Sequence, residues 1–263
     1  MPFKSILCGV EGNPSSTEAA RQAIAVAKPG GKVHFVAVYT SWELGPDFTK
    51  EKLQEALKEA TTMADEAGVT ATTEMPSSRY AVEVLLREGK NHDLLVIGTH
   101  GRSRAVGIMM GSTATKTAHG TEVPLLIARE PPGAAGFPSD ILFTSDGADD
   151  SWPPARVAAR LAADFDANLE LVHVEDGKHP DAAEVITAQV EEIEKIAGGK
   201  PVVAQPKGSA TDHIVELSKE KGSSLIICGR RGLSGIRSLG SVSERVAHQA
   251  DCSVMLVPSD SAD

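Results

Sequence analysis

A run of small residues, GTHGRSRAVGIMMGSTATK at residues 98–116, has the composition of a loop that brings its main chain close to a ligand. Gly98 and Gly101 can adopt positive φ and leave no Cβ between the backbone and a bound group. Three more small residues then open a helical pattern that runs to about residue 119: Gly111, Ser112 and Thr113. The first N–H groups of a helix lack intrahelical partners and lie at the positive end of its dipole, so they attract phosphate. The run therefore predicts a phosphate-binding loop that leads into a helix N-terminus.

A similar loop occurs in the second half of the chain, where five small residues hold matching places: Gly229, Gly232, Gly240, Ser241 and Ser243. Both loops also carry cationic side chains, although the whole chain is acidic: Arg102, Arg104, Arg230, Arg231 and Arg237. Local positive charge beside free amides suits a polyphosphate. Glycine and serine before a helix are also ordinary capping residues, so one loop alone would leave a purely structural role open. Duplication at equivalent places favours the functional interpretation.

The groups needed for catalysis do not accompany these loops. The sequence contains no Gly-x-x-x-x-Gly-Lys-Ser/Thr run, no Gly-x-Ser-x-Gly run and no pair of histidines at metal-ligand spacing. His119 and His248 lie at the C-terminal ends of corresponding helices, where a cation complements the helix dipole, so we interpret them as structural. His100 lies inside the first loop, where we expect a phosphate contact rather than a general base. The sequence therefore favours binding over catalysis.

Length, charge and cysteine content limit the class of protein. The 263 residues carry 36 acidic and 26 basic side chains, and the formal charge of -10 repels a nucleic-acid backbone at long range. No apolar run approaches the roughly 20 residues of a membrane span, and the first residues lack the apolar core of a signal peptide. Cys8, Cys228 and Cys252 lie within apolar runs, so we expect core thiols and no disulfide. These features predict a cytoplasmic protein that binds neither nucleic acid nor membrane.

Three segments of the first half recur in the second half in the same order. SILCGVEG recurs as DILFTSDG, LLVIGTHG as LIICGRRG, and GSTATKTAH as GSVSERVAH. The period is too long for a solenoid repeat, so it indicates two homologous domains. We predict them at residues 1–130 and 140–258, joined by the linker EPPGAAGFPS.

Short β-branched runs alternate with helical patterns in both halves. The runs predict strands at residues 5–10, 33–39, 70–75, 94–99, 124–128, 140–145, 168–174, 201–204, 224–229 and 253–257. Apolar stripes with a period near 3.6 predict helices that end at Gly68, Gly89 and Gly198. This alternation predicts an α/β fold in which helices cover both faces of a doubly wound, mostly parallel sheet. Ligands of such a sheet bind beyond the carboxyl ends of its strands, where both Gly-rich loops begin.

The first Gly-rich loop, with Gly-x-x-Gly, nine residues and then Gly-Ser, resembles the corresponding loop of the universal stress protein (UspA-like) family. GRRGLSGIRSLGSVSERVAHQADCSVMLVP resembles that family's C-terminal segment, and the resemblance spans almost the whole of both halves. The chain thus looks like a tandem universal stress protein. The resemblance implies a five-stranded, Rossmann-like sheet of order 3-2-1-4-5 in each half. It also implies ATP, with or without Mg²⁺, or a related adenine nucleotide such as AMP or cyclic AMP.

The resemblance also implies which residues lie next to the nucleotide. The phosphates would face the glycines, serines and threonine named above in each half. The acidic residue near the nucleotide would be Glu11 or Asp146, and the adenine would meet the main chain near Val38 or Val174. The leading hypothesis is a nucleotide-dependent stress-response regulator with at most slow ATP hydrolysis.

Two departures from the family pattern bear on stoichiometry. The second half has seven residues, 233–239, where the first half has nine, and the first half carries Glu11 where the family usually has aspartate. Loop length controls where the donors point, so we favour the first half and predict one or two nucleotides per chain. Two alternatives stay open: an interaction or dimerisation module of the same fold that binds no nucleotide, and a binder of cyclic AMP.

The final strands, VPLLIA and CSVMLV, are apolar and would lie at sheet edges. An exposed edge of this kind needs cover, and a proline at its start suits an edge position. We therefore expect the two halves to pair as an intrachain pseudo-dimer. Family analogy adds the expectation of a homodimer of chains.

Overall fold

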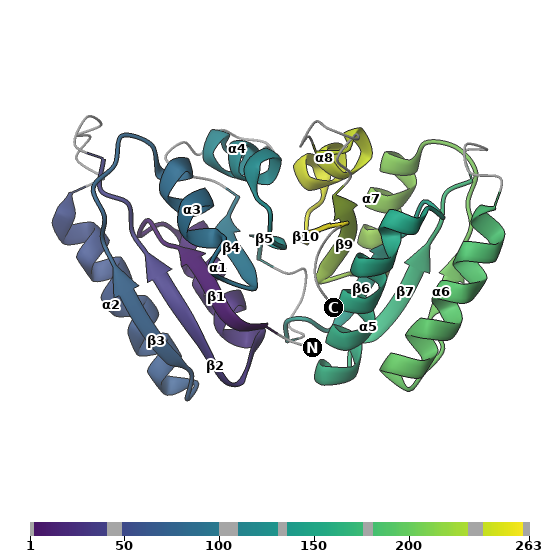
Figure 1. The fold of residues 1–263 in the computed structure, drawn as a ribbon, viewed down its shortest axis with the longest axis horizontal. Coiled ribbons are helices and arrows are strands. Elements are labelled where there is room, and N and C mark those ends of the chain that lie inside the picture. Colours follow the sequence, from purple (N-terminus) through teal and green to yellow (C-terminus); the bar gives the residue numbers. More distant parts are fainter. Residues whose placement is uncertain are drawn as a thin grey trace. The chain divides into compact units, whose positions relative to one another are not determined.

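The computed structural model of the chain describes residues 3–40, 49–99, 110–130, 136–175, 181–230 and 239–259 (Figure 1). The chain divides into two compact units, Pro2–Glu130 and Pro131–Asp263. Strands and helices alternate along both units, as the hydrophobic pattern predicts.

The first unit has a parallel sheet of order β3-β2-β1-β4-β5. Its strands are β1 (Phe3–Gly9), β2 (Ala27–Val36), β3 (Thr70–Glu74), β4 (Leu94–Gly98) and β5 (Leu125–Ala128). Its helices are α1 (Pro14–Ala25), α2 (Lys50–Glu66), α3 (Ala81–Gly89) and α4 (Ser112–Gly120). Helix α1 packs on α2, and α3 packs on α4. The strand order is the predicted 3-2-1-4-5.

The second unit repeats this order as β8-β7-β6-β9-β10, again parallel. Its strands are β6 (Asp140–Thr144), β7 (Asn168–Val172), β8 (Val202–Ala204), β9 (Leu225–Arg230) and β10 (Ser253–Pro258). Its helices are the 3-10 turn η1 (Asp149–Ser151), α5 (Trp152–Phe165), α6 (Ala182–Ala197), α7 (Ala210–Lys221) and α8 (Ser241–Gln249). The predicted doubly wound α/β class is thus confirmed in both units.

The inner strands of each sheet form the core. In β4 and β9 four successive residues are buried, 94–97 and 225–228, which is typical of parallel strands covered by helices on both faces. Cys8, Cys228 and Cys252 are buried thiols, as predicted. Among the described helices, none combines the length and the hydropathy that crossing a bilayer requires.

Local sequence explains where several helices begin and end. Gly68 and Gly198 follow α2 and α6 with φ of +68° and +78°, the left-handed conformation predicted for them. Helix α3 instead runs through Gly89. The apolar stripes did not predict α1, α5 or α7. In α1 the reason is that the buried face consists largely of alanine, whose signal is weak, although Asn13 followed by Pro14 is a helix-start signature.

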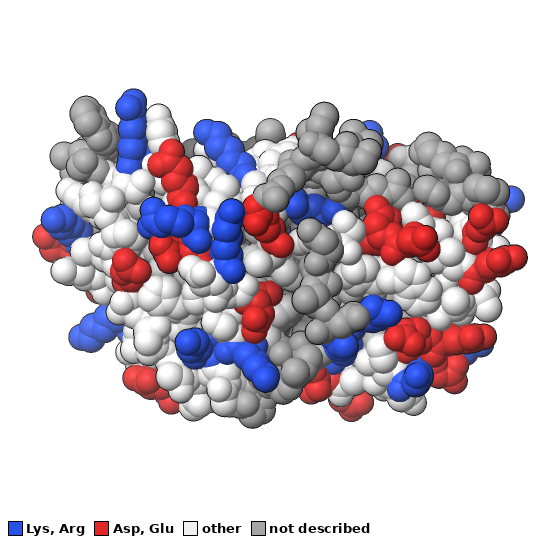
Figure 2. All heavy atoms as spheres, viewed as in Figure 1, with Lys and Arg blue, Asp and Glu red and all other residues white. Residues whose placement is uncertain are grey.

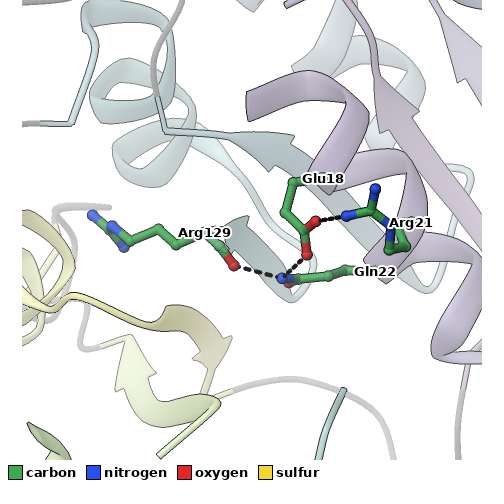
Figure 3. A network of polar contacts seen from close by, with 4 residues as sticks. All are labelled: Glu18, Arg21, Gln22 and Arg129. Carbon is green, nitrogen blue, oxygen red and sulfur yellow. Dashed lines mark hydrogen bonds and ion pairs between the residues drawn. The ribbon is translucent and has the colours of Figure 1, made fainter. Parts of the chain in front are cut away.

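A buried polar network fixes α1 on the end of β5 (Figure 3). The Gln22 side-chain amide donates to Glu18 Oε1 (2.8 Å) and to the main-chain carbonyl of Arg129 (2.7 Å). Gln22 has no exposed surface, and Glu18 is 6% exposed and also pairs with Arg21. Since buried polar groups are costly unless they are paired, this network holds α1 in one position along the sheet.

Candidate functional site

The carboxyl ends of the parallel strands bring most of the described candidate residues to one edge of each sheet. In the first unit, Glu11 follows β1, Val38 follows β2, and Gly98 ends β4. The Gly111 N–H donates to the Thr99 carbonyl (2.7 Å), which ties the start of α4 to the end of β4. Predicted site residues Gly101 and Gly232, together with His100, Arg102, Arg104, Arg231 and Arg237, lie outside the described residues.

The loop after β1 is held by hydrogen bonds to the first turn of α1. The Glu11 N–H donates to Ser16 Oγ (3.0 Å), and the Glu11 carboxylate accepts from the Asn13 amide (3.3 Å). Asn13 is also the N-cap of α1, where its side chain accepts from the Ser16 N–H (2.8 Å). Gly12 turns the chain with φ +72°. Sequence reasoning selected Glu11 and missed Asn13 and Ser16, although the NPSS run carries a helix N-cap signal.

Beyond β2 the chain stays extended, and successive residues use opposite sides for hydrogen bonding. The neighbours of Val38 bond to the β3 side: the Ala37 N–H to Glu74 (3.0 Å) and the Tyr39 N–H to Pro76 (2.9 Å). Val36 uses the other side, where its carbonyl accepts from the Val10 N–H (3.0 Å). Val38 shares that side with Val36, and within the described part of the chain its main-chain groups have no hydrogen-bond partner. Val38 therefore offers a donor and an acceptor at this edge.

Gly98 is needed for packing within the chain. A Cβ at this position would lie 2.4 Å from Ser15 Oγ and 2.6 Å from the Ser15 carbonyl oxygen, in the first turn of α1. Gly98 is not among the described glycines with positive φ, so the conformational reason given for it from sequence is wrong. The described partner of the Gly98 main chain is helix α1, and the approach of a ligand there stays a prediction.

The start of α4 has the features of an anion-binding helix terminus. Gly111 is the N-cap and has no side chain to offer, while Ser112 is exposed and Thr113 is half-buried. None of the described residues accepts a hydrogen bond from the N–H groups of residues 112–114. A helix end of this kind leaves donors at the positive end of the dipole.

The second unit repeats the Val38 arrangement and adds a buried histidine. His173 and Glu175 donate their N–H groups to Ala204 (2.9 Å) and Pro206 (3.0 Å), and the groups of Val174 between them have no partner among the described residues. His173 is 6% exposed, and its Nδ1 lies 3.0 Å from the Ser145 carbonyl. Since a carbonyl only accepts, His173 carries its proton on Nδ1.

The loop after β6 forms hydrogen bonds with the carboxylate of its own residue Asp146. Asp146 Oδ1 accepts from the Ala148 N–H (3.0 Å) and from Ser151 Oγ (3.1 Å). Gly147 has φ +77°, and a Cβ there would lie 2.4 Å from the Cβ of Ala182 at the start of α6. At the equivalent Gly12 the nearest atom would lie at 3.4 Å. The turn is therefore more tightly covered in the second unit than in the first.

The last helix of the second unit begins as α4 does. Gly240 is the N-cap without a side-chain bond, and Ser241 is exposed. The Ser243 hydroxyl, predicted to face phosphate, donates to the Gly229 carbonyl (2.7 Å). A Cβ on Gly229 would meet only ordinary contacts, with Pro154 Cγ at 3.6 Å. His119 and His248 lie in the last turns of α4 and α8, where sequence reasoning placed them.

The described residues of the site carry no activated nucleophile. Burial raises the pKa of the Cys8 thiol far above its ordinary value and that of Cys228 to about 12, so both stay protonated. No group of three or more potential metal ligands occurs within the described ranges. Acidic and basic side chains are mixed over the face shown in Figure 2. The arrangement is one of main-chain donors and acceptors, which suits binding.

These features define a duplicated α/β protein in which a helix at the carboxyl edge of each sheet has a glycine N-cap without a side-chain hydrogen bond. The model of the family described as "Universal stress protein family" matches residues 2–129 and 139–258. The chain belongs to the universal stress protein family and contains two such domains in tandem.

Individual relatives agree with this family. A universal stress protein of Methanocaldococcus jannaschii is 34% identical over 142 residues, which cover 49% of this chain and 84% of the relative. A crystal structure of a universal stress protein from Archaeoglobus fulgidus is similar in fold, with a TM-score of 0.75 and 20% identity over 97% of this chain and 96% of that one. A universal stress protein crystallised in complex with cAMP is 26% identical, with a TM-score of 0.40 over 46% of this chain and 98% of its own.

Proposed function

We propose that the chain binds an adenine nucleotide at the carboxyl edge of its first sheet and acts as a nucleotide-dependent regulator of a cytoplasmic stress response. The phosphates face the N-terminus of α4, where Gly111, Ser112 and Thr113 supply main-chain donors. The base lies beside the free donor and acceptor of Val38, and Glu11 lies near the sugar and phosphates. Mg²⁺ accompanies a triphosphate by neutralising part of its charge.

The uncapped start of α4 is the observation that carries this proposal. Its first-turn N–H groups have no acceptor among the described residues. Side chains of Asn13 and Thr49 cap α1 and α2, while α3 also begins without a side-chain cap, at Tyr80. A polar N-cap side chain at this position would stabilise the helix by about 1 kcal/mol. Glycine supplies none, which suits a site where a bound anion completes the cap.

The first unit is the better candidate of the two. In the second unit Asp146 is bonded within its own loop, the Gly147 turn lies closely under Ala182, and Ser243 is bonded to a carbonyl. A nucleotide bound in the second unit would have to break these contacts, or it could not use the groups that they occupy. We therefore expect tighter binding in the first unit.

Isothermal titration calorimetry of the full chain with ATP, AMP and cyclic AMP, each with and without Mg²⁺, tests the proposal. Ser112→Asp places a carboxylate among the α4 donors, where it favours the helix but repels phosphate, and should weaken binding about 10-fold or more. Ser241→Asp makes the matched change in α8, and Ser112→Ala removes only a hydroxyl. Absence of heat with every nucleotide, or equal affinity in wild type and Ser112→Asp, would reject the site.

A second candidate function, an interaction module without a nucleotide, is favoured by the Gly98 packing. Because Ser15 already requires glycine at this position, the family's Gly-rich pattern could persist here for packing alone. The same titration distinguishes the two functions, since a chain of this kind would be folded and thermally stable yet give no heat with any nucleotide.

A further inference from the structure

A second polar cluster lies in the first unit near the amino ends of β1 and β4, away from the carboxyl edge. It joins four elements through Ser5 on β1, His34 on β2, Thr72 on β3 and His92 in the turn before β4. None of these residues takes part in the proposed nucleotide site. The cluster therefore calls for its own explanation.

The two histidine rings are stacked, with centroids 5.9 Å apart and planes 7° from parallel. His92 Nδ1 lies 2.9 Å from Ser5 Oγ, and His34 Nδ1 lies 2.8 Å from Oγ1 of Thr72, its partner in the β2–β3 register. His34 Nε2 also faces Glu74 Oε2 at 3.6 Å, and the His34 side chain is 21% exposed. Hydroxyls can donate or accept, so either neutral tautomer of each ring can make these bonds.

The surroundings act differently on the two rings. Burial lowers the pKa of His92 below its ordinary value, and the charges of His34 and Lys32 lower it further. Asp93 and Glu88 oppose this shift without cancelling it. The charged groups near the pair are Lys32 on β2, Glu74 on β3, Glu88 on α3 and Asp93 before β4.

We propose that the stacked His34–His92 pair is a proton-responsive switch in which protonation of His92 separates the rings and loosens the turn before β4 from β1. Protonation places a positive charge on His92 in a half-buried place near the charge of Lys32. The Asp93 carboxylate, which accepts from the main-chain N–H groups of Lys4 and Ser5 (both 3.0 Å), is the contact most directly strained by movement of His92.

The direction of the pH effect follows from the His92 shift. Since the pKa of His92 is lower in the folded unit than its ordinary 6.5, the open form binds the proton more tightly. The stability linked to this group is therefore fully present above about pH 6.5 and is lost as the pH falls below that value. Only one proton is involved, so protection can fall at most about tenfold per pH unit.

The second unit lacks the pair and provides an internal control. Glu170 occupies the place of His34, since it pairs with Leu142 and Val202 as His34 pairs with Leu7 and Thr72. Glu170 forms an ion pair with Lys221 (3.3 Å), so a carboxylate takes the place of the imidazole there. The pH response should be confined to the first unit.

Hydrogen exchange of the full chain between pH 7.5 and 5, corrected for intrinsic rates, tests the switch. We expect protection of residues 88–96 to fall several-fold below pH 6.5, with the matching segment of β9 unchanged. His92→Asn, which keeps a partner for Ser5, should abolish this fall, while His213→Asn in the second unit should not alter it. Histidine NMR titration of the wild type gives a second measurement that needs no variant. The switch is refuted if His92 titrates at or above 6.5, or if His92→Asn retains the wild-type fall in protection.

Discussion

Substituting alanine for Gly98 tests how the first unit packs at its site. The added Cβ would lie 2.4 Å from Ser15 Oγ, 2.6 Å from the Ser15 carbonyl oxygen and 2.7 Å from its carbonyl carbon. The hydroxyl can rotate away, but the two main-chain atoms cannot, so the first turn of α1 must move by about 0.8 Å to restore ordinary contact. Gln22 anchors the same helix on the end of β5 and resists that movement. We expect a cost of about 1–3 kcal/mol, the usual range for overpacking.

Gly229→Ala is the matched control in the second unit. There the new Cβ would lie 3.6 Å from Pro154 Cγ and 3.9 Å from the Asp150 carbonyl oxygen, and φ is not positive. With no clash, alanine should stabilise the unit by about 0.4–1 kcal/mol through the lower entropy of the unfolded chain. The two substitutions should therefore act in opposite directions.

Native-state hydrogen exchange of the full chain measures both changes, because peptides from α1 and β4 report on the first unit and peptides from β9 report on the second. Gly98→Ala should raise the exchange rates of α1 and β4 by about 5- to 160-fold, the equivalent of its expected cost. Adding Ser15→Ala removes the hydroxyl contact but leaves both main-chain contacts, so rescue should be incomplete. Equal effects of Gly98→Ala and Gly229→Ala, or full rescue by Ser15→Ala, would refute the packing argument.

Three further predictions concern buried groups. Both amide atoms of Gln189 are buried without a partner in the described chain. Gln189→Leu should therefore stabilise the second unit by about 1 kcal/mol in urea denaturation. Destabilisation would indicate that water satisfies the amide. Burial raises the pKa of Cys8 and Cys228, so at pH 8 an aromatic disulfide reagent should modify them only as fast as the chain unfolds, and rapid reaction of either thiol would contradict this. Gln22→Leu should lower the free energy of unfolding by about 1–3 kcal/mol, because it leaves buried acceptors unpaired. The Arg21 side chain is 62% exposed, so Arg21→Ala should lower it by less than about 1 kcal/mol in the same assay.

Much of the fold could be predicted because it depends on local pattern. Strands such as β4 and β9 are continuous apolar runs, and Gly68 and Gly198 end their helices in the predicted conformation. Helix α1 was missed because alanines carry its buried face, and its pairing with the sheet becomes evident only when β4 and β5 lie beside it. The strands predicted at residues 33–39 and 168–174 end earlier, at Val36 and Val172, and isolated bridges follow them, Tyr39 to Ser77 and Glu175 to Lys207.

The candidate site was predictable in type but not in its contacts. Glycine before α4 and α8 was evident from the repeated Gly-Ser pairs. The partner of Gly98, by contrast, is 83 positions away in the sequence at Ser15, and no local pattern links them. The same holds for His34 and His92. Their rings stack across β1, which lies between β2 and β4 in the sheet.

Alone, the amino-acid sequence determined the duplication, the alternation of strands and helices, the burial of the thiols and the glycines at the helix starts, because periodicity and backbone freedom are properties of neighbouring residues. Tertiary structure decided which atoms fill the space beside Gly98 and Gly147, which main-chain groups of Val38 and Val174 lack a partner among the described residues, and which two histidines stack. Those outcomes depend on strand order and on the approach of helices from distant segments, and van der Waals contact and hydrogen bonding at 3 to 4 Å respond only to that final arrangement.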